Sequence, residues 1–311
     1  MNGSASLCSD LLAAHGLARD DPGVLVGQQA ASGILVRREN DGRYPAGAPA
    51  FNGGTGAGMW RPTPPQLSSM AVPWLSAVRP FTLNSPSQFR AEPPPRLDSA
   101  RYARDYDEVK TLGASNSVRT PEQTDLAYFW AANYGAVWNR VLRDLAALHV
   151  RTIGETARLF ALANIAAADA VISAWDSKRH YVYWRPITAI QEGENDGNPR
   201  TVGDRAWQPL IPTPNYPDYT SGANVVTAAM TRTLALFFGA ENMTFSVTNE
   251  MTQGKQKTRS YTRFSDASDE VVEARIYEGI HFRFADEAAQ TQGRGAARWV
   301  FERFLRPARD R

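Results

Sequence analysis

Cysteine is almost absent from this chain of 311 residues, in which Cys8 is the only one. An internal disulfide and a thiolate metal cluster are therefore excluded. An excess of one charge is also lacking, because 34 basic residues face 32 acidic residues and leave a net charge of +2. This balance argues against a nucleic-acid-binding surface and against a polybasic membrane tether. Any anion site must then come from a local cluster of cations.

Long apolar runs are scarce as well, and no stretch approaches the roughly 18 residues of a membrane span. We therefore expect no membrane-spanning segment. Residues 1–15 lack a basic stretch followed by an apolar one, so they do not read as a signal peptide. Because the sequence begins abruptly, we expect an N-terminal truncation.

Proline is concentrated in one region, because eleven of the 20 prolines lie between residues 45 and 95. Regular helix is excluded there. Aromatic residues such as Trp60 and Trp74 argue against a plain disordered linker. We predict that residues 1–100 pack on the core, with a short helix around Leu11–Leu17 and irregular chain from residue 21 onward. A flexible N-terminal arm is the alternative.

Helical spacing dominates the rest of the chain. Thr120 begins a capping box with Pro121 at the first helical position, and apolar residues follow at helical spacing as far as Leu145. The sequence contains no internal repeat and no alternation of strands and helices. We predict an all-α helical bundle, with the oxyanion-binding catalytic domain over residues 101–311. Further helices are expected over about 153–185, 221–239, 266 onward and 288–305, with one short strand over 244–248.

Three short segments carry side chains suited to a tetrahedral oxyanion such as phosphate or vanadate. Arginine matches an oxyanion with a two-pronged fork, lysine adds a point charge, and the amides at a helix N-terminus bind anions. The first segment holds Lys178 and Arg185, the second Ser221 and Gly222, and the third Arg275 and His281.

The spacing of these residues suggests how they are oriented. Lys178 and Arg185 are separated by nearly two turns at about 100° per residue, so both should project from one helix face. Asp286 follows His281 by five residues and would orient its imidazole on a continuous helix. Each segment alone has a structural explanation: the first could be solvated surface cations, the second a serine N-cap and the third a structural histidine. The joint occurrence of all three segments in this order is much less expected from structural roles alone.

The ordered set resembles the signature of the type-2 phosphatidic acid phosphatase and vanadium-dependent haloperoxidase superfamily. The text around it is similar to bacterial vanadium haloperoxidase-like proteins over roughly residues 90–298. The matching stretches are Lys178-x6-Arg185-Pro186, Ser221-Gly222, Arg275-x5-His281, Asp169-Ala-Val-Ile-Ser-Ala-Trp175-Asp176, Trp207-x-Pro-Leu and Gly279-Ile-His-Phe-Arg-Phe284.

The resemblance implies a role for each matching residue. Lys178, Arg185 and Arg275 would hold the equatorial oxygens of vanadate or phosphate, and Ser221 with the Gly222 amide would add hydrogen bonds. His281 would be the axial ligand of the vanadium in a haloperoxidase, or the nucleophile in a phosphatase. The family uses vanadate as a Lewis acid that activates peroxide for attack by halide, without a change of oxidation state.

One position departs from the family pattern. The family has a second histidine after Ser-Gly, where this chain has Ala223. That histidine is the usual acid and base, and the loss of such a group typically costs about 10²–10⁴-fold in rate. His180 should face away from the site, about 200° around the helix from Lys178. Asn224 could orient water or peroxide, and Asp169 and Asp176 could pair with a cationic ligand or be structural.

Three functions stay open at this point. The first is a vanadate-dependent haloperoxidase-like enzyme that uses hydrogen peroxide, a halide and an organic acceptor. The second is an acid phosphatase-type phosphohydrolase that binds phosphate and acts on phosphate esters through His281. The third is a catalytically impaired oxyanion-binding protein, which Ala223 keeps open. Related proteins are often exported, which fits a missing N-terminal segment, and a homo-oligomer is compatible with each function.

Overall fold

The structure is a computed structural model that describes residues 9–306. The chain divides into two compact units, residues 1–43 and 44–311. In the first unit residues 9–14 are helical, and helix α2 (Pro22–Arg38) follows. The expectation of irregular chain from residue 21 is wrong for this helix. The Asp21 carboxylate caps its first turn by accepting a hydrogen bond from the Gly23 amide, and Pro22 fits the first helical position.

The second unit opens with the proline-rich segment. It carries two short 3₁₀ helices, η1 (Pro73–Ala77) and η2 (Pro86–Phe89), and both pack against helix α6 (Ile153–Tyr181). The buried Asp169 carboxylate on α6 accepts hydrogen bonds from the amides of Phe81 and Thr82, at 2.6 and 2.8 Å. The segment is thus irregular, as predicted, and held to α6 by a buried carboxylate.

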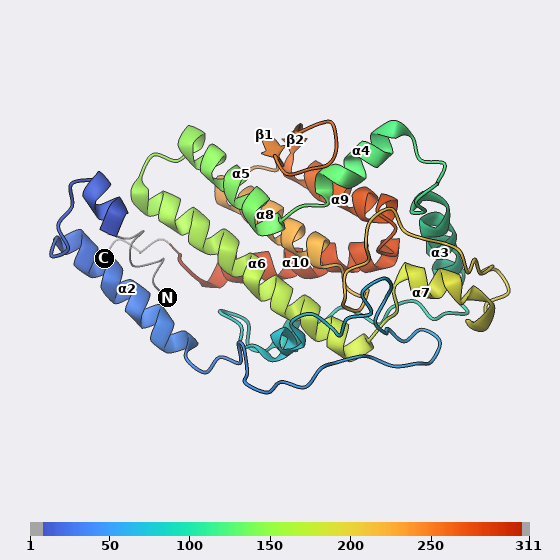
Figure 1. Ribbon diagram of the computed structural model, residues 1–311. Coiled ribbons are helices and arrows are strands. Elements are labelled where there is room, and N and C mark those ends of the chain that lie inside the picture. Colours follow the sequence, from blue (N-terminus) through green and yellow to red (C-terminus); the bar gives the residue numbers. More distant parts are fainter. Residues whose placement is uncertain (1–8, 307–311) are drawn as a thin grey trace. The chain divides into compact units, whose positions relative to one another are not determined.

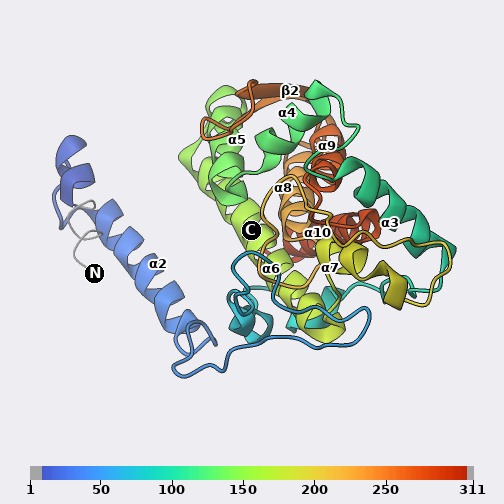
Figure 2. The same ribbon diagram turned by 45° about the vertical axis from the view of Figure 1, so that its right-hand side comes forward.

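The rest of the second unit is helical, which confirms the all-α prediction. At its centre α8 packs against α6, α9 and α10, and α4 and α5 cover the side that carries a small sheet (Figures 1 and 2). The other elements are α3 (Ala100–Leu112), α4 (Pro121–Trp130), α5 (Tyr134–His149), α7 (Pro186–Gln191), η3 (Gly193–Asn195), α8 (Gly222–Phe238), β1 (Asn242–Thr248), β2 (Thr258–Arg263), α9 (Phe264–Tyr277) and α10 (Arg283–Arg303).

Two expectations about elements need correction. The single helix expected from Thr120 to Leu145 is two helices, because the chain leaves the helical conformation at Ala131 and Asn133 caps α5 by accepting a hydrogen bond from the Ala136 amide. The single strand has an antiparallel partner, β2, in which Tyr261 lies opposite Phe245. Charged and hydroxyl residues fill the other positions of β2, so its apolar signal was weak.

Helix α6 ends four residues before the predicted end, and it is more apolar than the sequence reading allowed. By length and composition it could cross a membrane, with an 18-residue window of mean hydropathy 1.4. In the structure 56% of that window is buried inside the protein, where α6 packs against α8 and α10. Core helices of folded domains have the same character.

Candidate functional site

The first two predicted cations, Lys178 and Arg185, converge although they do not share a helix. Lys178 lies in the last turn of α6, which ends at Tyr181 because Val182 adopts a left-handed conformation with φ of 49°. Arg185 is the N-cap residue of α7, so the expectation of one common helix face is wrong. Both side chains are 0% exposed, which excludes solvated surface cations.

Tyr216 is the point where these two cations meet. Its ring centroid lies 4.8 Å from Lys178 Nζ and 4.8 Å from Arg185 Cζ. The ammonium of Lys178 donates to the carbonyls of Pro217 and Asp218, at 2.6 and 3.0 Å. The guanidinium of Arg185 donates from Nε to the Tyr216 carbonyl at 2.8 Å. The loop before α8 therefore fixes both cations through its backbone oxygens.

Ser221 and Gly222 begin helix α8, as predicted. Ser221 is the N-cap residue and is 0% exposed, and its side chain makes no capping bond. A Cβ at Gly222 would lie 3.3 Å from the Trp175 ring, so this position favours glycine for close approach. The first amides of a helix have no acceptor within the helix. They are available to an anion beside Ser221.

Arg275 and His281 come from the turn between α9 and α10. Arg275 lies in the last turn of α9, and Gly279 has a φ of 79°, where a Cβ would meet the Gly113 carbonyl oxygen at 2.3 Å. The chain reverses there, so His281 lies in the connection and α10 starts only at Arg283. The structure thus brings together all six side chains and backbone positions that the sequence singled out.

The carboxylate that orients His281 is Asp218, not Asp286. His281 Nδ1 lies 2.7 Å from Asp218 Oδ1, and both side chains are buried. Asp286 instead accepts a hydrogen bond from Asn224 Nδ2 at 2.7 Å, because the helix expected to join it to His281 is interrupted. The sequence reading placed Asp218 in a plain loop. Its position three residues before Ser221 was the available signal.

A second carboxylate was also missed. Glu278 is 0% exposed, and its Oε2 lies 2.5 Å from Arg275 Nη1. It follows Arg275 by three residues, a spacing that brings side chains together on a helix. Three cations therefore share the site with three buried carboxylates, those of Asp218, Glu278 and Asp286.

Burial shifts the pKa values of these groups. It lowers the pKa of Lys178 and that of His281, and the Arg185 cation lowers both further. Burial raises the pKa of Asp218 to about 7, against the opposing effect of Arg185. Burial also raises the pKa of Glu278 to about 7, against Arg275. A neutral His281 with its proton on Nδ1 has its lone pair on Nε2, which lies 3.2 Å from Arg185 Nη1, so a ligand at Nε2 would replace that contact.

Two buried donors test whether these residues fit an oxyanion. Within the described part of the chain, Arg185 Nη2 and Arg275 Nε have no hydrogen-bond partner. An unpartnered buried donor costs about 1–3 kcal/mol, and more when it is charged. Two such donors on neighbouring guanidinium groups fit a bound anion.

A cavity of about 440 Å³ opens beside these residues. Gly222, Ala223 and Arg275 form one side of it, and aromatic and aliphatic side chains form the rest. Ala223 is 9% exposed and lines this cavity directly. An acid and base at that position would therefore face the same space as Arg275.

The remaining candidates have structural roles or lie elsewhere. His180 is exposed at the surface end of α6. Asp176 pairs with Arg90 through two hydrogen bonds of 2.7 and 2.8 Å, and Asp169 holds the proline-rich segment. The partners of these two carboxylates are therefore Arg90 and the proline-rich segment, not Lys178, Arg185 or Arg275.

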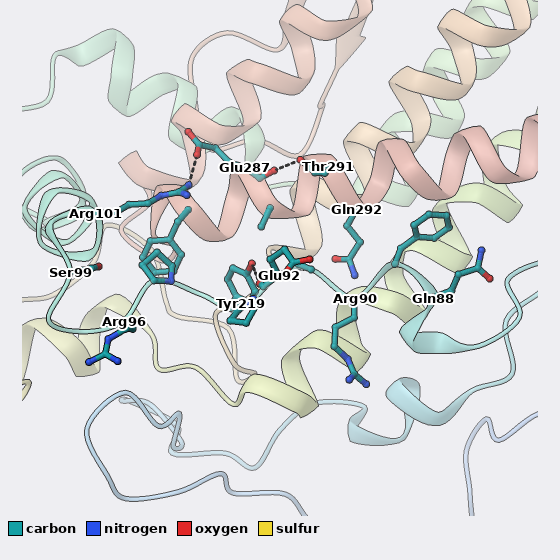
Figure 3. A pocket seen from close by; sticks show the side chains of 16 residues that line it. Gln88, Arg90, Glu92, Arg96, Ser99, Arg101, Tyr219, Glu287, Thr291 and Gln292 are labelled. Carbon is teal, nitrogen blue, oxygen red and sulfur yellow. Dashed lines mark hydrogen bonds and ion pairs between the residues drawn. The ribbon is translucent and has the colours of Figure 1, made fainter.

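A larger groove, of about 770 Å³, is lined by none of the predicted oxyanion residues. Figure 3 shows Tyr219 and Gln292 on its wall, with Arg90 and Arg101 at its edges. Gln292 accepts a hydrogen bond from Thr220 Oγ1 at 2.7 Å and donates to the Ser173 hydroxyl at 2.9 Å. The groove thus adjoins the back of the loop that carries Ser221.

Known proteins resemble this chain in sequence and in fold. The VCPO second helical-bundle domain matches residues 158–310. Vanadium chloroperoxidase from Curvularia inaequalis is 24% identical over 270 residues, covering 65% of this chain and 44% of that protein. The chain thus spans less than half the length of that curated relative.

Solved structures extend the likeness over most of the chain. A bacterial vanadium-dependent iodoperoxidase superposes with a TM-score of 0.77 at 30% identity, covering 90% of this chain and 69% of that one. The holo-type bacterial vanadium-dependent chloroperoxidase gives a TM-score of 0.77 at 17% identity, covering 97% and 78% of the two chains. Its apo-type gives 0.74 at 19%, covering 94% and 77%. These last two show the fold alone.

The structure is thus a helical bundle that buries three cations, a serine and a histidine at its candidate site. The likeness to the iodoperoxidase in sequence, fold and coverage then places this chain in the vanadium haloperoxidase family. Its homologues are oxidoreductases that use vanadate, peroxide and halide.

Proposed function

We propose that this chain is a vanadate-dependent haloperoxidase-like enzyme, with Lys178, Arg185, Ser221, Gly222, Arg275 and His281 as its cofactor site. The observation that carries the proposal is the pair of unpartnered buried donors, Arg185 Nη2 and Arg275 Nε. Buried charged donors are normally hydrogen-bonded, so two unpartnered donors on two arginines of one site favour a bound anion.

The residues of the site divide the work. Lys178, Arg185 and Arg275 bind the oxygens of the anion by charge and hydrogen bonds. Ser221 and the first amides of α8 add neutral donors. His281 offers Nε2 as the ligand atom, since its Nδ1 lies 2.7 Å from the Asp218 carboxylate, which favours the proton on Nδ1. Bound vanadate would supply Lewis acidity toward peroxide.

The overall reaction requires a proton that the chain must deliver. Hydrogen peroxide, a halide ion and one proton give hypohalous acid and water, with the halide losing two electrons and the peroxide gaining them. Ala223 lacks a titratable side chain, so the family's usual donor is absent from this position. We infer that halide oxidation is slower than with a histidine there.

A phosphohydrolase is the second candidate. The contact between Asp218 and His281 favours it, because an oriented imidazole can also attack a phosphate ester once Nε2 gives up its contact with Arg185. The same Ala223 weighs more heavily against it, since ester cleavage needs an acid for the leaving alcohol. Release of p-nitrophenol from its phosphate ester, inhibited by vanadate, would favour this candidate over the first.

A calorimetric titration with orthovanadate tests the cofactor site. We expect the wild-type protein to bind, and Lys178→Ala and His281→Ala each to weaken binding more than about tenfold, because hydrogen bonds to charged groups contribute about 1.5–3 kcal/mol. His180→Ala is the matched control, since that histidine is exposed on the same helix. A folded wild-type protein that does not bind orthovanadate would refute the proposal. Peroxide-dependent bromination then tests for turnover.

A further inference from the structure

A second cluster of cations lies at the C-terminal half of α8, away from the oxyanion site. Arg232 of α8, Arg263 at the end of β2 and Arg294 of α10 line one pocket of about 160 Å³, which we call the arginine pocket. Helix α8 packs against α9 and α10, as Figure 1 shows. Arg232 follows Ser221 by eleven residues, which is roughly 16 Å along a helix that rises about 1.5 Å per residue. None of the described residues that line the arginine pocket belongs to the proposed oxyanion site.

The close approach of α10 to α8 brings two of these arginines to one pocket. Gly293 permits this approach, because a Cβ there would collide with the Val225 carbonyl oxygen and lie 3.0 Å from the Ala228 Cβ. Arg294 is the next residue on α10, and Arg232 lies about one turn after Ala228 on α8. Both side chains therefore extend from closely packed helices to the same pocket.

The three guanidinium groups have no carboxylate partner. Among the described residues, none of these arginine side chains takes part in an ion pair or a hydrogen bond. The one carboxylate that lines the pocket in this part of the chain is that of Glu241, and its Oε1 accepts a hydrogen bond from the Ser265 amide at 2.7 Å. The net charge of the whole chain is only +2, so the excess of positive charge here is local. Like charges around one small pocket repel each other, and an anion from solution would relieve that repulsion.

Hydroxyl groups stand beside the arginines. Thr231, Ser265 and Ser268 line the pocket. Ser268 is buried, and its Oγ accepts a hydrogen bond from Gln290 Nε2 at 3.1 Å, which leaves the hydroxyl hydrogen to donate. The N-terminus of α9 is not the basis of this site, because Glu241 already accepts from the amides of the first two residues of that helix. The arginines and hydroxyls are the donors that remain for a ligand.

The donors and the size of the pocket select the ligand. Arginine forks match the oxygens of a phosphate group, and hydroxyls add neutral donors. The volume of about 160 Å³ is smaller than the roughly 300–1,000 Å³ typical of sites for whole organic molecules, so the pocket suits one tetrahedral anion. Phe264 is the one apolar residue among the described residues that line it, so an apolar ligand would gain little there. Arg263 and Arg294 are exposed, so the rest of a phosphate ester can stay in solvent.

We propose that the arginine pocket binds a phosphate group at the protein surface, as a second anion site separate from the buried one. Inorganic phosphate and the phosphate of a small ester present the same chemistry to it. A bound phosphate offsets the repulsion among the three guanidinium groups and should stabilise the folded protein. The site uses none of Lys178, Arg185 and His281, so it stands or falls separately from the proposed haloperoxidase function.

The test is calorimetric titration of inorganic phosphate into the wild-type protein and a variant that carries both Arg232→Gln and Arg294→Gln. All titrations use one low ionic strength, because salt screens exposed charges. A variant with Arg143→Gln and Arg298→Gln is the matched control, since both arginines are exposed and lie outside the pocket. We expect two phosphate ions to bind the wild-type and control proteins, and the pocket variant to bind one of them at least about tenfold more weakly. Equal stoichiometry and affinity in the folded pocket variant and the wild-type protein would overturn the inference.

Lys178→Ala separates the two sites. It removes a cation of the buried site and leaves the arginine pocket unchanged, so the phosphate that this variant still binds should depend on Arg232 and Arg294. Loss of all phosphate binding in a folded Lys178→Ala protein would overturn the pocket. Phosphate binding that depends on the pocket, in a protein whose orthovanadate binding does not depend on Lys178 or His281, would support the pocket and refute the proposed function.

A parallel titration with glycerol phosphate distinguishes the two sources of the phosphate group. Binding of both ligands, weakened alike by Arg232→Gln with Arg294→Gln, would support a pocket that reads the phosphate group alone. Binding of inorganic phosphate only, with the same dependence on the arginines, would support a pocket for the free anion. Binding of neither ligand at the pocket would overturn the inference.

Discussion

Replacing Asp218 by asparagine should separate vanadate binding from phosphate binding. Asp218 Oδ1 lies 2.7 Å from His281 Nδ1 and 3.5 Å from Arg185 Nη1, and all three side chains are buried. The carboxylate therefore both orients the imidazole and offsets the charge of the arginine. Asparagine keeps the shape and removes the charge.

Asp218→Asn has two opposite effects on anion affinity, one through the orientation of His281 and one through the lost negative charge. Losing a carboxylate that orients a metal-ligating histidine typically costs about 10–100-fold in affinity, or about 1.4–2.8 kcal/mol. Losing a negative charge beside three cations favours any bound anion by Coulomb attraction. In the proposed site vanadate would depend on a bond to His281, so it should bind more weakly. Phosphate depends only on charge and hydrogen bonds and should bind at least as well as it does to the wild-type protein.

Titration calorimetry with both anions measures this difference. Asp286→Asn is the matched control, because Asp286 is equally buried beside the site but bonds Asn224 rather than His281. Its ratio of vanadate to phosphate affinity should stay at the wild-type value. Equal losses of both anions in a folded Asp218→Asn protein would show that Asp218 only supports the structure. Thermal melting checks folding, since an uncompensated buried charge costs about 3–5 kcal/mol.

Three further changes have directions that follow from the structure. Ala223→His should raise bromide oxidation by about 10²–10⁴-fold in steady-state assays, and no gain would mean that the proton comes from elsewhere. Burial raises the pKa of Glu278 to about 7, so stability from this group is lost as the pH rises from about 4.5 to 7. Urea melts should then show Glu278→Gln gaining stability relative to the wild-type protein across that window, and a constant difference would contradict this. Asn133→Ala should lower the free energy of unfolding by about 0.5–2 kcal/mol through loss of the α5 cap, and an unchanged urea midpoint would show that the cap is dispensable.

The sequence predicted those parts of the fold that depend on local signals. Helix α8 lies between Ser221 and Gly239, as expected from its apolar run and terminal glycine. Helix α6 begins at Ile153 as predicted, and the capping box at Thr120 is present. The division between α4 and α5 was missed because both helices continue the same apolar spacing, and only the Asn133 cap marks the interruption.

The sequence also predicted the cationic half of the site, but not the carboxylates that accompany it. Lys178, Arg185 and Arg275 stand in recognisable motifs, whereas Asp218 lies in a loop without periodicity. Asp218 can contact His281 and Arg185 only because α6, α8 and the turn after α9 meet, and this meeting is a property of the tertiary structure. The expected pairing of His281 with Asp286 was wrong because it assumed one helix from His281 to Asp286, whereas α10 starts only at Arg283.

The burial of three cations at the candidate site needs an explanation other than stability. Transferring an ion pair from water to a protein interior costs several kcal/mol per ion, and well-packed apolar residues often stabilise a fold equally well. Stability alone therefore does not account for three buried cations. Asp218 and Glu278 compensate Arg185 and Arg275 in charge, yet Nη2 of the first and Nε of the second still lack acceptors. Those two donors are the cationic part of the cluster that folding leaves without acceptors, and the proposed oxyanion, held between them and His281, would supply an acceptor for both.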